Sequence, residues 1–396
     1  MRPGDKTPIH LRLRADFGLT HEEGACLPLR SRHGQCHACV DACPARALSV
    51  TIAAVELSDA CTGCGVCTAV CPTQALVLPE MADWAGPVTP IAEPMTRRVE
   101  CRKVPLQAHR AETTVLPCLG ALTPGHLLAR AAAGIEVQVV DRGWCQGCEA
   151  GCQDTPAGHP ASSALAAAAL WLESVGSERR PMLVREPLPL TLRPAAIPPA
   201  PEEAPALDRR RFFRAALERP SGRQRAQATP MGGDGRAAYP ADARQPAPER
   251  ERQRLALERL SQDLGTAMPA EFYPQLHADA RCCDRRMCAA LCPTAALTVV
   301  DGGAAAHLQW SSERCIACGT CVRACPETAL SLSAHGGAAG RHTLASHLRA
   351  RCPSCGDAYT PTEEQAPAAA PALCPTCAKS RRFMDDARRQ LFGALN

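Results

Sequence analysis

Cysteine is the residue type in this sequence whose number and spacing could do chemistry. The chain has 25 cysteines among 396 residues, and thiolates bind soft metals and iron–sulfur clusters. Residues 61–72 and 315–326 each read Cys-x2-Cys-x2-Cys-x3-Cys-Pro. This spacing is typical of cubane [4Fe–4S] clusters, because three thiolates reach one cluster and the fourth reaches its neighbour. The sequence therefore predicts iron–sulfur binding in two places.

The two motifs belong to an internal repeat. An earlier Cys-Pro pair precedes each motif, at 43–44 and 292–293, and all four pairs lead into an Ala-Leu segment. Residues 26–80 and 280–333 resemble bacterial two-cluster ferredoxins, a small α+β fold that transfers electrons without catalytic side chains. The resemblance implies one cluster on Cys43, Cys61, Cys64 and Cys67, and a second on Cys292, Cys315, Cys318 and Cys321.

Each copy departs from that family in its first motif. His33 stands three residues before Cys36, where a cysteine is expected, and Arg285 stands three residues before Cys288. Upstream cysteines could substitute, although adjacent cysteines both reach one cluster only through an unusual backbone turn. The alternatives are a [3Fe–4S], labile or absent cluster, or ligation by His33. The expected ligand sets are Cys26, Cys36, Cys39 and Cys71 in the first copy, and Cys282, Cys283, Cys288 and Cys325 in the second.

A further group of cysteines lies between the two copies, in an expected α/β unit. Residues 127–133 are typical of a helix and 134–140 of a buried strand. About 55 residues here resemble the small iron–sulfur subunit of hydrogenase–heterodisulfide reductase complexes, which implies a [2Fe–2S] cluster that relays electrons between larger subunits. Structural or free thiols are the alternative. The candidate ligands are Cys101, Cys118, Cys145 and Cys148, and Cys152 closes the group.

The last cysteines form two Cys-x2-Cys pairs with the spacing of a zinc ribbon. Four thiolates close a tetrahedral structural zinc site, and the expected metal ligands are Cys352, Cys355, Cys374 and Cys377. We expect a structural or protein-docking role. Nucleic-acid binding is weakly supported, because the arginines at 381–382 are offset by the aspartates at 385–386.

The remaining sequence indicates how the chain is divided into domains and a linker. Residues 181–249 are rich in Pro, Ala, Arg and Gly and could not bury enough apolar surface to fold. Helical patterns at 162–175 and 251–264 flank this segment. The expected fold is α+β: a ferredoxin-like module at 1–95, an α/β domain at 96–178, a flexible linker at 179–250 with a short helix near 211–217, a helix and second module at 251–340, and a zinc ribbon at 341–396.

Composition and missing motifs exclude several functions. The net charge of +4, from 44 basic and 40 acidic residues, is too balanced to argue for nucleic acid. We expect no membrane span and no secretory signal, and the RRRFFR at 209–214 reads as the start of a basic helix rather than an export motif. Cysteines in metal-ligand spacing favour a reducing cytoplasm. No nucleotide-binding motif or catalytic residue is identified.

The sequence therefore predicts an iron–sulfur electron-transfer protein, either a polyferredoxin or a subunit that relays single electrons between partner oxidoreductases. A flexible linker would let its two modules swing between partners. The alternative is an accessory protein for redox-enzyme maturation, since the chain resembles ferredoxin-type proteins associated with nitrate reductase in its several cubane motifs and arginine-rich segment. A redox-sensing regulator that binds nucleic acid through the zinc ribbon is disfavoured by the balanced charge.

Overall fold

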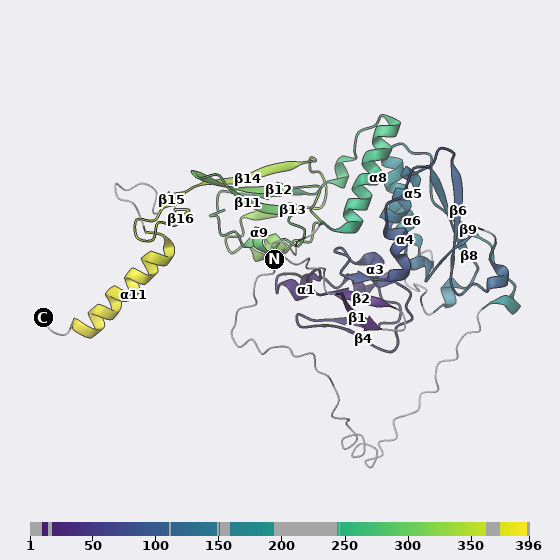
Figure 1. Ribbon diagram of the computed structural model, residues 1–396, viewed down its shortest axis with the longest axis horizontal. Helices are drawn as coiled ribbons and strands as arrows, with labels where there is room; N and C mark the ends of the chain where they lie inside the picture. Colours follow the sequence, from purple (N-terminus) through teal and green to yellow (C-terminus); the bar gives the residue numbers. More distant parts are fainter. Residues whose placement is uncertain are drawn as a thin grey trace, which may run out of the picture.

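The computed structural model describes residues 10–14, 18–110, 112–148, 150, 159–193, 244, 246–361 and 373–393. Three predictions lie outside these residues: the helix near 211–217, the basic run at 209–214 and the ligand candidate Cys152. The described chain forms two small modules, a four-stranded α/β domain beside the first module, and a C-terminal helix that extends from the second (Figure 1).

The first module is built from two small antiparallel sheets with short helices between them. One sheet has the order β1-β2-β5, and the other is the hairpin β3-β4. The α-helices of this module are each only about one turn long. The elements are β1 (His10–Arg14), β2 (Leu19–Glu22), α1 (Leu27–Arg30), α2 (Ala38–Asp41), β3 (Leu48–Val50), β4 (Val55–Leu57), α3 (Val66–Val70), β5 (Leu76–Val77), η1 (Pro79–Met81) and α4 (Ala82–Ala85).

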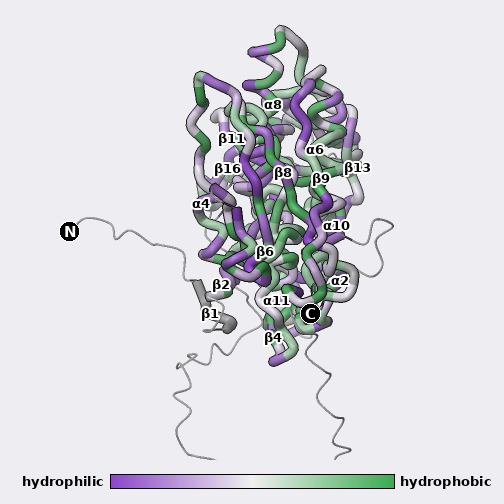
Figure 2. Tube along the Cα trace, turned by 90° about the vertical axis from the view of Figure 1, so that its right-hand side faces the viewer, coloured by the Kyte–Doolittle hydropathy of each residue, from purple (hydrophilic) through white to green (hydrophobic). Residues whose placement is uncertain are grey.

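The middle domain is a parallel sheet of order β7-β6-β8-β9. Figure 2 shows β6, β8 and β9 running side by side. Parallel strands need crossover connections, which helices α5 and α6 supply here. The elements are β6 (Met95–Cys101), η2 (Leu106–Ala108), β7 (Thr114–Leu116), η3 (Leu119–Ala121), α5 (Pro124–Ala132), β8 (Ile135–Asp141), η4 (Cys145–Gly147), α6 (Ser162–Ser174), β9 (Met182–Arg185) and η5 (Leu190–Leu192).

The second module repeats the plan of the first and extends it. The pair β10-β13 corresponds to β2-β5, and the hairpin β11-β12 corresponds to β3-β4, with β14 added at the edge of β12. The elements are α8 (Pro248–Leu264), η7 (Ala270–Phe272), β10 (Gln275–Ala278), α9 (Met287–Leu291), β11 (Leu297–Asp301), β12 (Ala305–Ser311), α10 (Thr320–Ala324), β13 (Leu330–Ser333) and β14 (Arg341–Leu348).

The C-terminal region differs from a simple ribbon. The first cysteine pair lies on the short hairpin of β15 (Ala350–Arg351) and β16 (Ala358–Tyr359). The second pair lies at the start of a long helix, α11 (Pro375–Phe392), with Cys374 as its N-terminal cap. The helix forms because the residues after Cys377 are good helix formers, without glycine or proline until Gly393.

One hydrophobic core joins the first module, the middle domain and α8. It contains Leu76 and Trp84 from the module, Leu128 from the sheet domain, and Leu257 from α8. The second module has its own core around Leu308 and Trp310. Helix α8 therefore belongs by packing to the first half of the chain, although it follows the predicted linker in sequence.

The predicted domain boundaries differ from the structure on both sides of the linker. Strand β9 and the turn η5 lie inside the residues predicted as linker, and α8 begins at Pro248, three residues before the expected module boundary. The edge strand was missed because only Met182, Leu183 and Val184 are apolar in a proline-rich stretch. The predicted helices at 127–133, 162–175 and 251–264, and the strand at 134–140, correspond to α5, α6, α8 and β8.

Candidate iron–sulfur and metal sites

The four Cys-Pro turns share one backbone geometry. In each turn, the third residue after the cysteine adopts a left-handed conformation, with φ between 48° and 52°. This turn aims a backbone N–H at the cysteine sulfur, and such hydrogen bonds tune bound clusters. The residues in the left-handed conformation are Arg46, Gln74, Ala295 and Thr328. The N–H donors to sulfur are Ala47 (3.3 Å), Ala75 (3.2 Å), Leu297 (3.5 Å) and Ala329 (3.4 Å).

The two complete Cys-x2-Cys-x2-Cys loops also share a geometry. Gly63 and Ala317 occupy the position before the second cysteine, with φ of 66° and 51°, and Gly65 and Gly319 follow it, with φ of 78° and 70°. A Cβ at Gly65 would lie 2.9 Å from the Ala121 Cβ. Glycine is therefore required at this position both for its backbone conformation and for close packing of the loop on the middle domain.

These loops and the distant Cys-Pro cysteines line two matching cavities, one in each module. The residues lining the first include Cys43, Cys61, Cys64 and Cys67. Those lining the second include Cys292, Cys315, Cys318 and Cys321. Each cavity thus gathers the four thiols that the ferredoxin resemblance assigns to one cluster. Burial raises the pKa of Cys67 and of Cys321, and neighbouring thiolates raise it further, so cluster binding would be coupled to proton release.

The second site of the first module brings together the four cysteines predicted for it. Burial raises the pKa of Cys26 to about 12, and the thiolates of Cys71, Cys39 and Cys36 add to this shift. The upstream Cys26 thus interacts electrostatically with the other three thiols. His33, the alternative ligand, has its Nε2 3.4 Å from the Arg32 Nε.

The second site of the second module is different. One cavity is lined by Cys282, Cys288 and Cys325, together with Cys283 and His347. The first three thiols interact electrostatically: burial raises the pKa of Cys288, and Cys282 and Cys325 raise it further. The Cys283 Sγ donates a hydrogen bond to the Glu327 Oε1 at 3.5 Å. The His347 Nε2 lies 3.5 Å from the Cys282 Sγ. Sequence reasoning missed His347 because it lies on β14, far along the chain and without a motif.

The backbone of this second site retains the loop of a complete motif. Asp284 and Arg286 have φ of 56° and 60°, which places them as counterparts of Gly63 and Gly65 in the first module. Cys282 then corresponds to the first cysteine of the motif. Arg285 stands in place of the middle cysteine, and Cys283 stands at a position between ligands.

The middle-domain cysteines lie at the carboxyl ends of the parallel strands, where loops of an open α/β sheet form binding sites. Burial raises the pKa of Cys118 to about 12, and Cys101 and Cys148 are among the thiolates that raise it further. Burial, with Asp141 and these same thiolates, also raises the pKa of Cys145. The Lys103 Nζ lies 3.4 Å from the Cys148 Sγ. The thiols of the four predicted ligands thus interact with one another electrostatically.

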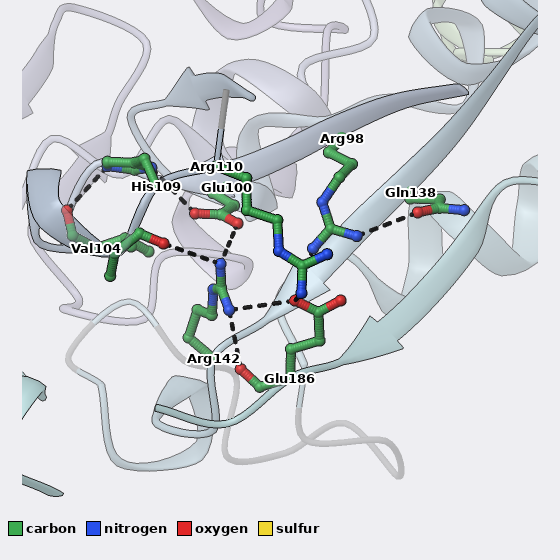
Figure 3. Close-up of polar contacts among 9 residues, drawn as sticks. Arg98, Glu100, Val104, His109, Arg110, Gln138, Arg142 and Glu186 are labelled. Carbon is green, nitrogen blue, oxygen red and sulfur yellow. Dashed lines mark hydrogen bonds and ion pairs between the residues drawn. The ribbon is translucent and has the colours of Figure 1, made fainter. Parts of the chain in front are cut away.

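A network of buried ion pairs holds these strand ends together (Figure 3). Glu100, which is fully buried next to Cys101, accepts a hydrogen bond from Arg142 at 2.6 Å. Arg142 in turn contacts Glu186, which follows β9, at 3.3 Å. The network ties β6, β8 and β9 together beside the cysteines, so it fixes where their loops begin.

Cys145 also belongs to a second group of residues with metal-ligand side chains. Its sulfur, an Asp141 oxygen and a His159 ring nitrogen all lie within 4.8 Å of one another. His159 is 3% exposed, and its Nε2 has no hydrogen-bond partner among the described residues. Its Nδ1 accepts a hydrogen bond from the Ala161 N–H at 3.2 Å, which leaves the proton of a neutral ring on Nε2, so ligation through Nε2 is not favoured.

The C-terminal group has the donor set of a four-thiolate metal site. The sulfurs of its four cysteines lie within 4.8 Å of one another, and those of Cys355 and Cys374 are 3.8 Å apart. The Cys374 N–H lowers the pKa of Cys352 to about 6, which favours the thiolate that a metal requires. Cys352 and Cys374 are also buried. These residues fit a metal ion such as zinc.

Arginines connect the loops of neighbouring sites. Arg102, next to Cys101, donates hydrogen bonds to the carbonyls of Thr62 (3.3 Å) and Gly63 (3.4 Å) in the first cubane loop. Arg323 donates from Nε to the His33 carbonyl and from NH2 to the Cys318 carbonyl, both at 2.8 Å. The first pair of contacts joins the middle domain to the first module, and the second joins the two modules.

Comparison with known families agrees with this geometry. Residues 55–77 and 308–331 each match the model of the 4Fe-4S binding domain, and these segments contain the two complete motifs. A search of curated proteins found no match. The chain is thus an iron–sulfur protein with two ferredoxin-like 4Fe-4S binding domains and belongs to the broad class of electron-transfer proteins. Within the described residues, no helix combines the length and apolarity that a bilayer crossing needs.

Proposed function

We propose that this chain relays single electrons between partner oxidoreductases through a line of five cysteine sites. When bound, the clusters would supply one-electron oxidation and reduction. The cysteines hold each cluster, and backbone N–H groups donate to the sulfurs. The apolar core excludes water from the two cavities lined by the complete Cys-x2-Cys-x2-Cys loops, which we call the inner sites. A partner protein would supply the substrate chemistry, as a polyferredoxin or an electron-transfer subunit requires.

The observation that carries this proposal is the continuity of the line. The middle-domain site adjoins the first cubane loop through Arg102, and within the first module Cys39 and Cys43 pack against one core together with Cys67. The first module adjoins the second through Arg323. In the second module the cysteines of both sites pack on a single core. Consecutive sites are thus in contact from the middle domain to β14.

The proposal assigns ligands as follows. The inner cubanes use Cys43, Cys61, Cys64 and Cys67, and Cys292, Cys315, Cys318 and Cys321. A third cubane uses Cys26, Cys36, Cys39 and Cys71, and a fourth uses Cys282, Cys288 and Cys325 with one further ligand. A [2Fe–2S] cluster uses Cys101, Cys118, Cys145 and Cys148. Cys352, Cys355, Cys374 and Cys377 bind structural zinc, whose closed site suits a docking or stabilising role.

The first test is composition and reversibility in the full-length protein, purified without oxygen. We expect roughly 16 to 18 irons and about one zinc per chain. Reduced methyl viologen should reduce the clusters, and ferricyanide should reoxidise them without loss of iron. If the clusters instead move to an apo-ferredoxin during this cycle, the chain is an accessory protein for cluster delivery and the relay proposal is wrong.

The second test asks whether the sites form one line. Cys39→Ser removes a ligand from the third cubane, which lies between the two inner cubanes. In the reduced wild type, neighbouring paramagnetic clusters should show magnetic coupling by electron paramagnetic resonance (EPR). In the variant, the second module's inner cubane should lose its coupling to the third cubane but keep its coupling to the fourth, whereas the control Cys355→Ser should retain both. An unchanged second-module spectrum in Cys39→Ser would mean that the modules are separate electron carriers.

A further inference from the structure

The second module has one cluster site in which a motif ligand is replaced. The loop from Cys282 to Cys288 keeps the left-handed residues of a complete motif at Asp284 and Arg286. Its middle ligand position is Arg285, whose guanidinium is directed to Glu327 at 3.2 Å. Arginine offers no lone pair to a metal. Three thiols therefore face this site from the motif positions, and one corner of a cubane needs a ligand from elsewhere.

We propose that the Nε2 of His347 is the ligand at this corner, so that three cysteines and one histidine hold the fourth cubane. His347 lines the same cavity as Cys282, Cys288 and Cys325. Its Nε2 is 3.5 Å from the Cys282 Sγ, so the imidazole faces the same space as the first thiol of the motif. The inference rests on the proposed function only in assuming that this site holds a cluster.

The strand that carries His347 supports this orientation. On β14, Ser346 and Leu348 are exposed while His347 between them is half-buried, as alternation along a strand requires. His347 pairs in register with Ala306 on β12, which is fully buried. Among the described residues of the first module, the corresponding hairpin β3-β4 has only two strands and no counterpart of β14. The added strand thus supplies a residue that the ferredoxin plan alone would not provide.

Cys283 is the competing ligand, and its contacts oppose that role. Its Sγ donates a hydrogen bond to the Glu327 Oε1 at 3.5 Å. Its loop position corresponds to Thr62 and Ile316 in the two complete motifs, and neither of these is a ligand type. Histidine, in contrast, is a common metal ligand as the neutral imidazole.

The test compares His347→Ala with Cys283→Ala in the full-length, anaerobically purified protein. His347→Ala should lose about one iron per chain, and its oxidised form should show a new [3Fe–4S] EPR spectrum. Cys283→Ala should keep the wild-type iron content. His347→Cys should restore the cubane with a lower reduction potential, because an anionic thiolate replaces a neutral ring. Unchanged spectra from the other cubanes would show that each variant is folded.

A spectroscopic measurement separates ligation from a hydrogen bond. In protein labelled with 15N-histidine, pulsed EPR of the reduced fourth cubane should detect a strongly coupled nitrogen that disappears in His347→Ala. A weak coupling alone would make His347 a hydrogen-bond donor to Cys282, and the proposal would be wrong. Loss of iron from Cys283→Ala but not from His347→Ala would also overturn it. Neither result would affect the relay test, which depends on the inner cubanes and the third cubane.

Discussion

At the residue scale, His126 shows how strongly the core controls charge. The side chain is 3% exposed at the start of α5, and its Nδ1 accepts a hydrogen bond from the Thr123 N–H at 3.2 Å. Burial lowers its pKa to about 2, and the nearby cations Arg252 and Arg130 contribute to this shift. The folded protein therefore holds this imidazole neutral, whereas the unfolded chain would protonate it near the ordinary value of 6.5.

This pKa difference predicts a pH dependence of stability. Because the folded pKa is depressed, the stabilising contribution is complete above about pH 6.5 and is lost as the pH falls, by up to about 1.4 kcal/mol per unit. His126→Gln should remove much of this pH dependence, because glutamine does not titrate. Glutamine can also keep the helix-capping contact, so the variant should still fold. Urea unfolding between about pH 7.5 and about pH 5.5 measures it. Exposed His277→Gln is the control, and parallel slopes for wild type and His126→Gln would contradict the prediction.

The sequence predicted most candidate ligands because cysteine motifs are local. The loops at 61–72 and 315–326 carry their ligands at fixed spacing, so the residue types alone were sufficient. His347 and His159 could not be predicted in this way. Each approaches its cysteine only through strand pairing or a loop crossing in the folded chain, and a single histidine has no recognisable spacing.

At the element scale, Glu249 clamps two helices together. From the first turn of α8, its carboxylate accepts a hydrogen bond from the Thr123 hydroxyl at 2.7 Å and from the Gly125 N–H at 2.6 Å. Both donors lie at the N-terminus of α5, where the helix dipole favours a negative charge. A Cβ at Gly125 would lie 2.7 Å from the carboxylate, so a glycine here permits this close approach.

Removing the clamp should loosen α8 from α5. We expect Glu249→Ala to lower the free energy of unfolding by about 2 kcal/mol, because two charge-assisted and largely buried hydrogen bonds are lost. Anaerobic urea unfolding measures the change. Glu258→Ala, which removes a more exposed pair with Arg254 on the same helix, should cost about 0.5 kcal/mol or less. Equal losses in the two variants would show that Glu249 is not a special contact.

Secondary structure was predictable where periodicity was strong and sequence neighbours set the pattern. Helices α5, α6 and α8 follow apolar spacing, and β8 follows a buried run. The short edge strand β9 has only a brief apolar run, and its place in the sheet depends on pairing with β8. The packing of α8 on the first core was likewise invisible, because it depends on the distant residues Trp84, Thr123 and Gly125.

At the scale of the whole molecule, a side-chain contact joins the two modules, which the sequence alone could not show. Arg323 bridges the His33 and Cys318 carbonyls, so the sites proposed for the third cubane and for the second module's inner cubane are held side by side. A guanidinium at this junction also lies near both sites. Its positive charge should stabilise their reduced, more negative states.

Arg323→Ala should therefore lower the reduction potentials of these two cubanes by on the order of tens of millivolts and weaken their magnetic coupling. Redox titration followed by EPR measures both effects. Arg341→Ala removes an exposed cation on β14 of the same module and should leave both quantities unchanged. A similar shift in the two variants would assign the effect to net charge rather than to the bridge.

The position of α8 has a consequence for how the chain is made. Leu257 and Leu260, together with Ala256, Phe272 and Tyr273, complete a core whose remaining residues, from Leu19 to Val175, are synthesised earlier. Domains tend to fold as they emerge from the ribosome, but this core lacks the apolar side chains of α8 until that helix has been translated. A fragment ending at residue 193 would thus expose the apolar surface of α5 and α6, and nascent chains would present it to chaperones or to one another. The core of the first half of the protein can therefore be completed only after α8, from the second half, has been synthesised.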